Sequence, residues 1–137
     1  MKTKINTRIF LALLLLVVIV STSCKKNKDK QIPPVLDLKT GSGYTSVDKT
    51  LPMNDTITVG VNCQKSEDKD LLTRFVETKA YDGAASTTIL NESFNQDSYS
   101  KDMTIITRNV AGTERYTFTI INRDGLVTTK ALVFTVL

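Results

Sequence analysis

Residues 114–136 read ERYTFTIINRDGLVTTKALVFTV, and this stretch decides the fold. Apolar side chains alternate with other residues in both of its halves: Tyr116, Phe118 and Ile120, then Leu132, Phe134 and Val136. A two-residue period is typical of β-strands with one buried and one wet face. Between the halves, Asp124-Gly125 supplies the positive φ angles of a tight turn. The stretch therefore predicts an antiparallel hairpin of strands 114–122 and 126–136.

Further strands can be placed outward from this hairpin. Over 56–63 every second residue is apolar, which predicts another half-buried strand. Shorter apolar sets mark the others: Leu36 with Leu38, Ile89 with Leu90 and Phe94 in an edge strand over 86–94, and Met103 with Ile105 near 99–108. Turn signals separate these runs. About seven short strands over 35–137 predict one immunoglobulin-like antiparallel β-sandwich, an all-β fold.

The segment 66–80 fits two structures. Leu71, Leu72, Phe75 and Val76 stand at helical spacing. Residues that form helices poorly are interspersed with them, namely Thr73, Val76 and Thr78. A strand with a bulge near Arg74 is therefore favoured over a short helix.

Residues 1–23 are expected to be a lipoprotein signal peptide. Met1 to Arg8 is basic, and residues 9–20 form an uninterrupted apolar run. This run is as long as the apolar core of a signal peptide and too short to span a bilayer as a helix. Small residues then lead to Cys24. The pattern resembles a bacterial lipoprotein signal, and Ser21, where leucine is usual, suits the looser Bacteroidetes-type signal.

That resemblance implies that the cleaved chain begins at a lipidated Cys24, which anchors it to a membrane. Several acyl chains on one residue give stable anchoring. A non-lipidated secretory signal and an uncleaved anchor are the alternatives. Residues 24–34, rich in lysine and ending in Pro33-Pro34, are expected to be a flexible tether.

The charge separates by region. Residues 1–30 carry seven basic and one acidic side chain, whereas residues 31–137 carry eleven basic and thirteen acidic ones. The whole-chain net charge of +4 therefore belongs to the signal and the tether. A nucleic-acid-binding domain needs clustered basic residues on its folded part, so no nucleic-acid partner is expected.

The 137 residues contain no histidine and only two cysteines. Histidine-dependent nucleophiles, histidine-ligated metals and a disulfide scaffold are therefore excluded. Cys63 falls in the apolar register of its strand and is expected to be a buried thiol. We expect no catalytic residues and no enzyme.

Carboxylates are the main chemical groups that remain. Glu67, Asp68 and Asp70 cluster just before a predicted strand. A solvated loop is the expectation, with no metal or other cofactor. A structural Ca²⁺ held by these acids, or a small carboxylate-dependent hydrolase, is the alternative.

Three tyrosines, Tyr44, Tyr81 and Tyr99, lie in or beside predicted loops and are the candidate ligand-binding aromatics. Sugars stack on exposed aromatic faces, tryptophan above all, and this chain has no tryptophan. Strand-end tyrosines that half-cover the core are the expectation, and a glycan platform is the alternative.

Residues 111–120, AGTERYTFTI, followed by Asp124-Gly125, resemble the penultimate strand of polycystic-kidney-disease-type and related immunoglobulin-like domains. Residues 41–46, GSGYTS, are similar to small immunoglobulin-like domains of Bacteroidetes lipoproteins of uncharacterised function. The resemblance covers most of 35–137 and implies an immunoglobulin-like module on an envelope lipoprotein. It carries over no binding residue.

Together these features predict a non-catalytic binding or structural module, anchored by Cys24 in the cell envelope at the outer membrane. Its partner would be an envelope protein or a glycan, held by loops at one end of the sandwich or by the edge strand 86–94. An accessory glycan-binding lipoprotein of a polysaccharide-uptake system is the alternative. The sequence leaves open the ligand, the membrane face and the oligomeric state.

Overall fold

The computed structural model describes residues 31–137. The predicted signal peptide, Cys24 and the tether as far as residue 30 lie outside the described residues. Eight strands account for most of the described part: β1 Val35–Leu38, β2 Lys49–Leu51, β3 Thr56–Gln64, β4 Leu72–Tyr81, β5 Thr87–Gln96, β6 Ser98–Ile106, β7 Gly112–Asn122 and β8 Val127–Val136. No helix in the described part is long and apolar enough to cross a membrane.

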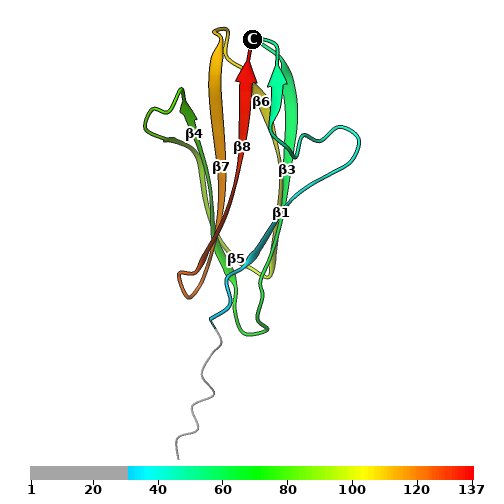
Figure 1. Ribbon diagram of the computed structural model, residues 1–137. Helices are drawn as coiled ribbons and strands as arrows, with labels where there is room; N and C mark the ends of the chain where they lie inside the picture. Colours follow the sequence, from blue (N-terminus) through cyan, green and yellow to red (C-terminus); the bar gives the residue numbers. More distant parts are fainter. Residues whose placement is uncertain (1–30) are drawn as a thin grey trace, which may run out of the picture. The chain divides into compact units, whose positions relative to one another are not determined.

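The strands form two sheets, shown face to face in Figure 1. One sheet has the order β1-β3-β6, and the other has the order β2-β8-β7-β4-β5. Every pairing is antiparallel except that of β2 with β8. The predicted hairpin is confirmed as β7 and β8, with Gly125 at φ 80° in its turn. The strand count is eight rather than seven because β2, three residues long before Pro52, has no alternation to reveal it.

The core lies between the sheets and follows the predicted alternation. Phe75, Phe118 and Phe134 are fully buried at its centre. The apolar faces predicted for β3, β7 and β8 are buried, and so are Leu36, Met103 and Ile105. Burial of side chains of this size is worth about 1.5–3 kcal/mol each, so the core is the main source of stability.

Residues 72–81 are a strand, which confirms the favoured interpretation of 66–80. Strand β4 shifts register against both of its neighbours between Leu72 and Arg74, at the position of the predicted bulge. Phe75 then points into the core. Residues 66–71 form the loop before the strand.

Strand β4 also carries a buried acid. Glu77 is 5% exposed and shares the inward face with Phe75. Burial raises the pKa of its carboxyl, and the nearby ammonium groups of Lys101 and Lys79 oppose that rise. An acid whose pKa is higher in the folded than in the unfolded chain weakens folding as the pH rises through both values.

Glu77→Gln should therefore raise the free energy of unfolding at pH 7, because the amide is neutral at every pH. The gain should shrink as the pH falls through the raised pKa of Glu77 and should be lost below the ordinary carboxyl pKa of 4.5, where the acid is protonated in both states. Glu92→Gln should instead lower the free energy of unfolding at pH 7, since Lys101 and Tyr99 lower the pKa of the Glu92 carboxyl and so favour its charged form. Urea titrations at pH 7 and pH 4 measure both effects, and a Glu77→Gln chain less stable at pH 7 would contradict the prediction.

Candidate functional site

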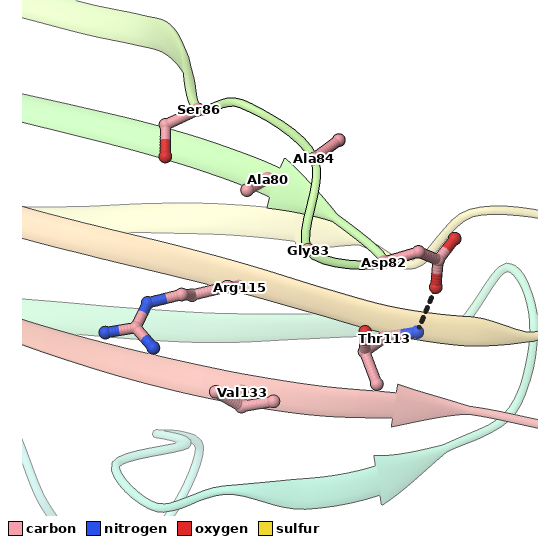
Figure 2. A pocket seen from close by; sticks show the side chains of 8 residues that line it. All are labelled: Ala80, Asp82, Gly83, Ala84, Ser86, Thr113, Arg115 and Val133. Carbon is pink, nitrogen blue, oxygen red and sulfur yellow. Dashed lines mark hydrogen bonds between the residues drawn. The ribbon is translucent and has the colours of Figure 1, made fainter.

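The outer face of the five-stranded sheet is hollowed at the end of β4. The hollow has a volume of about 320 Å³. Residues of β4, the β4–β5 turn, β7 and β8 line it, as Figure 2 shows. It is the first element of the candidate site.

Small side chains create this hollow. Ala80 of β4, Arg115 of β7 and Val133 of β8 are cross-strand neighbours on the outer face. The chain then turns at Asp82 and Gly83, which have φ angles of 49° and 77°. Because Ala80 and Gly83 project so little, the space beside Arg115 stays open.

Asp82 at the rim of the hollow is held by protein donors although its side chain is exposed. Its carboxylate accepts hydrogen bonds from the Thr113 amide, at 2.8 Å, and from the guanidinium of Arg108, at 2.7 Å. The second carboxylate oxygen lies 2.7 Å from Arg108 Nη1, so the pair is bidentate. The hydrogen bond from Arg108 lowers the pKa of Asp82 to about 2.

Arg108 continues inward to a buried acid. Glu114 is 0% exposed, and its carboxylate accepts hydrogen bonds from the Arg108 amide at 2.7 Å and the Tyr116 hydroxyl at 3.0 Å. Arg108 Nε lies 3.9 Å from the same carboxylate and is buried without a hydrogen bond. The guanidinium also lies over the Tyr81 ring, 5.1 Å from its centroid. We call Tyr81, Asp82, Arg108 and Glu114 the Arg108 network.

A second hollow, of about 290 Å³, lies on the same sheet beside β2 and shares Val133 with the first. The two together are called the furrow. Asp48 in the second hollow accepts a hydrogen bond from the Val133 amide at 2.8 Å. Among the described residues, the side chains of Arg115 and Lys49 have no ion pair and no hydrogen bond. Lys49 pairs with the buried Phe134, so its side chain belongs to the inner side of the sheet, and Arg115 is the cation on the outer face of the furrow.

The structure places Tyr44 on the outside of the other sheet. Its hydroxyl donates to Asp102 at 2.9 Å, and Lys39 Nζ lies 2.6 Å from the same carboxylate. Lys39 also lies over the Tyr44 ring. Gly60 makes this packing possible, because a Cβ there would lie 2.6 Å from Lys39 Cδ and 2.8 Å from Tyr44 Cε1.

The other two candidate tyrosines have different surroundings. Cations of Lys79 and Arg108 cover the Tyr81 ring. Tyr99 stands at the start of β6, where a strand-end tyrosine over the core was expected, and it is more deeply buried than half-covering implies: its ring stacks on Phe75 and Phe94 at centroid distances of 4.9 and 4.7 Å. Each ring therefore has its own neighbours, and Tyr99 offers no exposed face for a sugar.

The acidic run before β4 is divided between surface and interior. Asp70 is buried, where its carboxylate accepts from the Leu71 amide at 2.8 Å and the Asn122 side-chain amide at 2.5 Å. Asp68 is exposed. Among the described residues no three acidic or cysteine side chains, Glu67 included, gather into a group that could hold a metal ion. Asp70 thus ties the loop to the β7–β8 turn.

Cys63 is a buried thiol, as predicted, and burial raises its pKa to about 12. The sequence reasoning missed Arg115, Lys49 and the Arg108 network. The hairpin pattern marked Arg115 only as an outward-facing polar residue. No local pattern could bring Lys49 beside β8, since these two strands pair across more than eighty residues of chain.

No family model matches this chain, and no curated protein matches it. Among solved structures, it is similar to a superoxide reductase (neelaredoxin) from Ignicoccus hospitalis, with 7% identity and a TM-score of 0.52. That likeness covers 77% of this chain and 81% of the other, and it concerns the fold alone. The fold is an immunoglobulin-like β-sandwich.

Two structures of a β-glucosidase from Listeria innocua, with glucose and with gluconolactone, are also similar. They are 12% and 15% identical over 76% of this chain, with TM-scores of 0.45 and 0.43. The chain spans only 17% of the length of that enzyme.

Proposed function

We propose that this chain is a cell-envelope lipoprotein of the Bacteroidetes type, whose lipidated Cys24 holds a non-catalytic binding module at the outer membrane. The basic start and the apolar run 9–20 support export, and the tether 24–34 would separate the module from the lipid surface. The module is an immunoglobulin-like domain of the polycystic-kidney-disease kind. It engages another envelope protein through the edge of β5.

The exposed edge of β5 carries this proposal. The two sheets have four edge strands: β1, β6, β2 and β5. Strand β1 has four residues and follows Pro33-Pro34, and β2 has three residues and precedes Pro52. Strand β6 carries the charged pair Lys101 and Asp102. Short length, proline and charge are the features that keep edge strands from pairing with other chains.

Strand β5 lacks most of this protection. It has ten residues, no proline and no lysine, and it pairs only with β4. Its single charged residue, Glu92, is turned toward β6. There the Glu92 carboxylate forms an ion pair with Lys101 and accepts a hydrogen bond from the Tyr99 hydroxyl at 2.6 Å. Register shifts near its ends leave Leu90 to Ser93 as its regular part. A strand from a partner could extend the five-stranded sheet there.

The test follows the chain in intact cells. The wild-type chain should fractionate with membranes and Cys24→Ala should not, because the lipid anchor is lost. Cys63→Ala, which changes the other cysteine, should stay with membranes. A photo-cross-linking residue at Asn91 of β5 should give an adduct of defined mass, and the same residue at Thr129, on the outer face of β8, should not.

Membrane retention of Cys24→Ala would refute the anchor. Equal cross-linking from Asn91 and Thr129, or none from either, would refute β5 as the docking edge.

A further inference from the structure

The two strands on this side of the sandwich, β5 and β6, carry no unpaired charge. The single charged residue of β5, Glu92, forms an ion pair with Lys101 of β6. The other charged residue of β6, Asp102, forms an ion pair with Lys39 and accepts a hydrogen bond from the Tyr44 hydroxyl. A chain that pairs with the free edge of β5 therefore meets charges that are already neutralised on both strands.

An edge strand of this kind fits a second copy of itself. In a symmetric pair each strand faces an identical strand, so an unpaired charge at its centre would meet a like charge. Like charges directly opposite each other on neighbouring strands destabilise the pairing. Complementary charges are what steer a different partner to its surface, and β5 has none to offer such a partner.

The geometry of antiparallel strands limits where a twofold axis can lie. Residues that face each other across such a pair lie on the same side of the sheet, whereas successive residues of one strand lie on opposite sides. The axis must therefore pass through a residue that meets its own copy, and it cannot pass between two residues. The regular part of β5 runs from Leu90 to Ser93, so its two central residues, Asn91 and Glu92, are the candidates.

Asn91 fits this position and Glu92 does not. With Glu92 on the axis, two carboxylates would face each other at the centre of the pair. Asn91 lies opposite Val76 on the outer face of the sheet and is exposed. Its carboxamide has both a donor and an acceptor, so two copies of this side chain can hydrogen-bond to each other.

We propose that β5 pairs with β5 of a second copy of this chain, antiparallel, about a twofold axis at Asn91. In this register Leu90 of one copy faces Glu92 of the other, and the exposed Ile89 faces Ser93. The five-stranded sheets of the two copies join into one sheet across the axis. This inference rests on the proposed function, because it identifies the envelope protein that β5 engages as a second copy of the same chain.

Two differently tagged full-length chains, each with the photo-cross-linking residue at Asn91, test the identity of the partner in intact cells. The adduct should have twice the mass of the chain. With equal expression, about half of the adducts should carry both tags, since identical copies pair at random. An adduct of another mass that carries only one tag would overturn the second copy as the partner and leave β5 as the docking edge.

Charge substitutions at Asn91 test the position of the axis. When both tagged chains carry Asn91→Lys, or both carry Asn91→Glu, like charges meet on the axis. Co-isolation of the two tags in neutral detergent should then fall about fivefold or more. A chain with Asn91→Lys should co-isolate with a chain carrying Asn91→Glu at least as well as wild-type chains co-isolate with each other, because opposite charges now meet.

Thr129→Lys in both chains is the matched control. It adds the same charge on the outer face of β8, away from β5, and should leave co-isolation unchanged. Because Asn91 is exposed, its variants should melt at the wild-type temperature, which separates loss of pairing from loss of fold.

Three results would overturn the inference: no co-isolation of differently tagged wild-type chains, equal loss from Thr129→Lys and Asn91→Lys, or no recovery when the Lys and Glu variants are combined. The proposed function fails in other ways. Membrane retention of Cys24→Ala refutes the anchor without touching the pairing of β5, and the absence of any adduct from Asn91 refutes the docking edge together with this inference.

Discussion

Gly112→Ala should lower the free energy of unfolding by about 2–5 kcal/mol, through backbone strain and overpacking together. Gly112 begins β7 with a φ of 145°, where residues with a side chain are rarely found. A Cβ at this position would overlap Arg108 Nη2 and Asp82 Oδ1 and lie 3.1 Å from Arg108 Cζ. The guanidinium cannot move aside without breaking its bidentate pair with Asp82.

Gly125→Ala is the matched control for the strain alone. Gly125 also has a positive φ, of 80°, but no atom lies within 4 Å of a Cβ built there. This substitution should lower stability by about 1 kcal/mol. Urea denaturation of the two variants measures the difference. Equal losses of stability in the two variants would show that the side chains of the Arg108 network shift at no cost to admit the added methyl group.

The fold could be predicted from the sequence wherever a two-residue period was long enough. The β7–β8 hairpin and β3 have five or more alternating positions, and all their predicted apolar faces are buried. The same alternation of inward and outward residues also places residues inward that the prediction did not include. Tyr99 stands four residues before Met103, so it belongs to the inward face of β6. Tyr99 stands beside the β5–β6 turn, as expected, and this inward parity explains why its ring is buried rather than half-covered.

Parity also places two acids inward. Glu77 follows Phe75 by two residues, and Glu114 precedes Tyr116 by two. A buried acid lowers the stability of the fold unless another group pairs with it, and the sequence alone does not show whether such a partner is present. Glu114 is paired because the loop before β7 brings back the Arg108 amide. Glu77 has no such loop beside it, and the nearby ammonium groups only partly offset its burial.

The candidate site was less accessible to sequence reasoning because it depends on pairings between distant segments. The furrow exists because β2 lies beside β8 and the β4–β5 turn lies over β7. Asp82 at its rim is paired with Arg108, which lies more than twenty residues further along the chain. Neither of these contacts produces a recognisable spacing or motif in the sequence, so a search for tyrosines and acidic runs could not find the furrow.

Glu114→Ala should lower the free energy of unfolding by about 3–5 kcal/mol, the usual effect of removing one partner of a buried charge pair. The change leaves the Arg108 amide and the Tyr116 hydroxyl without their acceptor, and the Arg108 guanidinium without its inner carboxylate. Tyr116→Phe removes only the hydroxyl and should lower stability by about 1 kcal/mol. A Glu114→Ala loss no larger than that of Tyr116→Phe would contradict a structural role for the ion pair.

Combining the substitutions tests whether Arg108 connects them. Gly112→Ala and Glu114→Ala both disturb the position of Arg108, so the double variant should lose less stability than the two single losses added together. Gly125 lies in the β7–β8 turn, outside the Arg108 network, so Gly125→Ala should add to Glu114→Ala within about 0.5 kcal/mol. Urea denaturation of the three single and two double variants measures both sums. If the losses of Gly112→Ala and Glu114→Ala add, the β4–β5 turn and the start of β7 are held together independently of the buried Glu114.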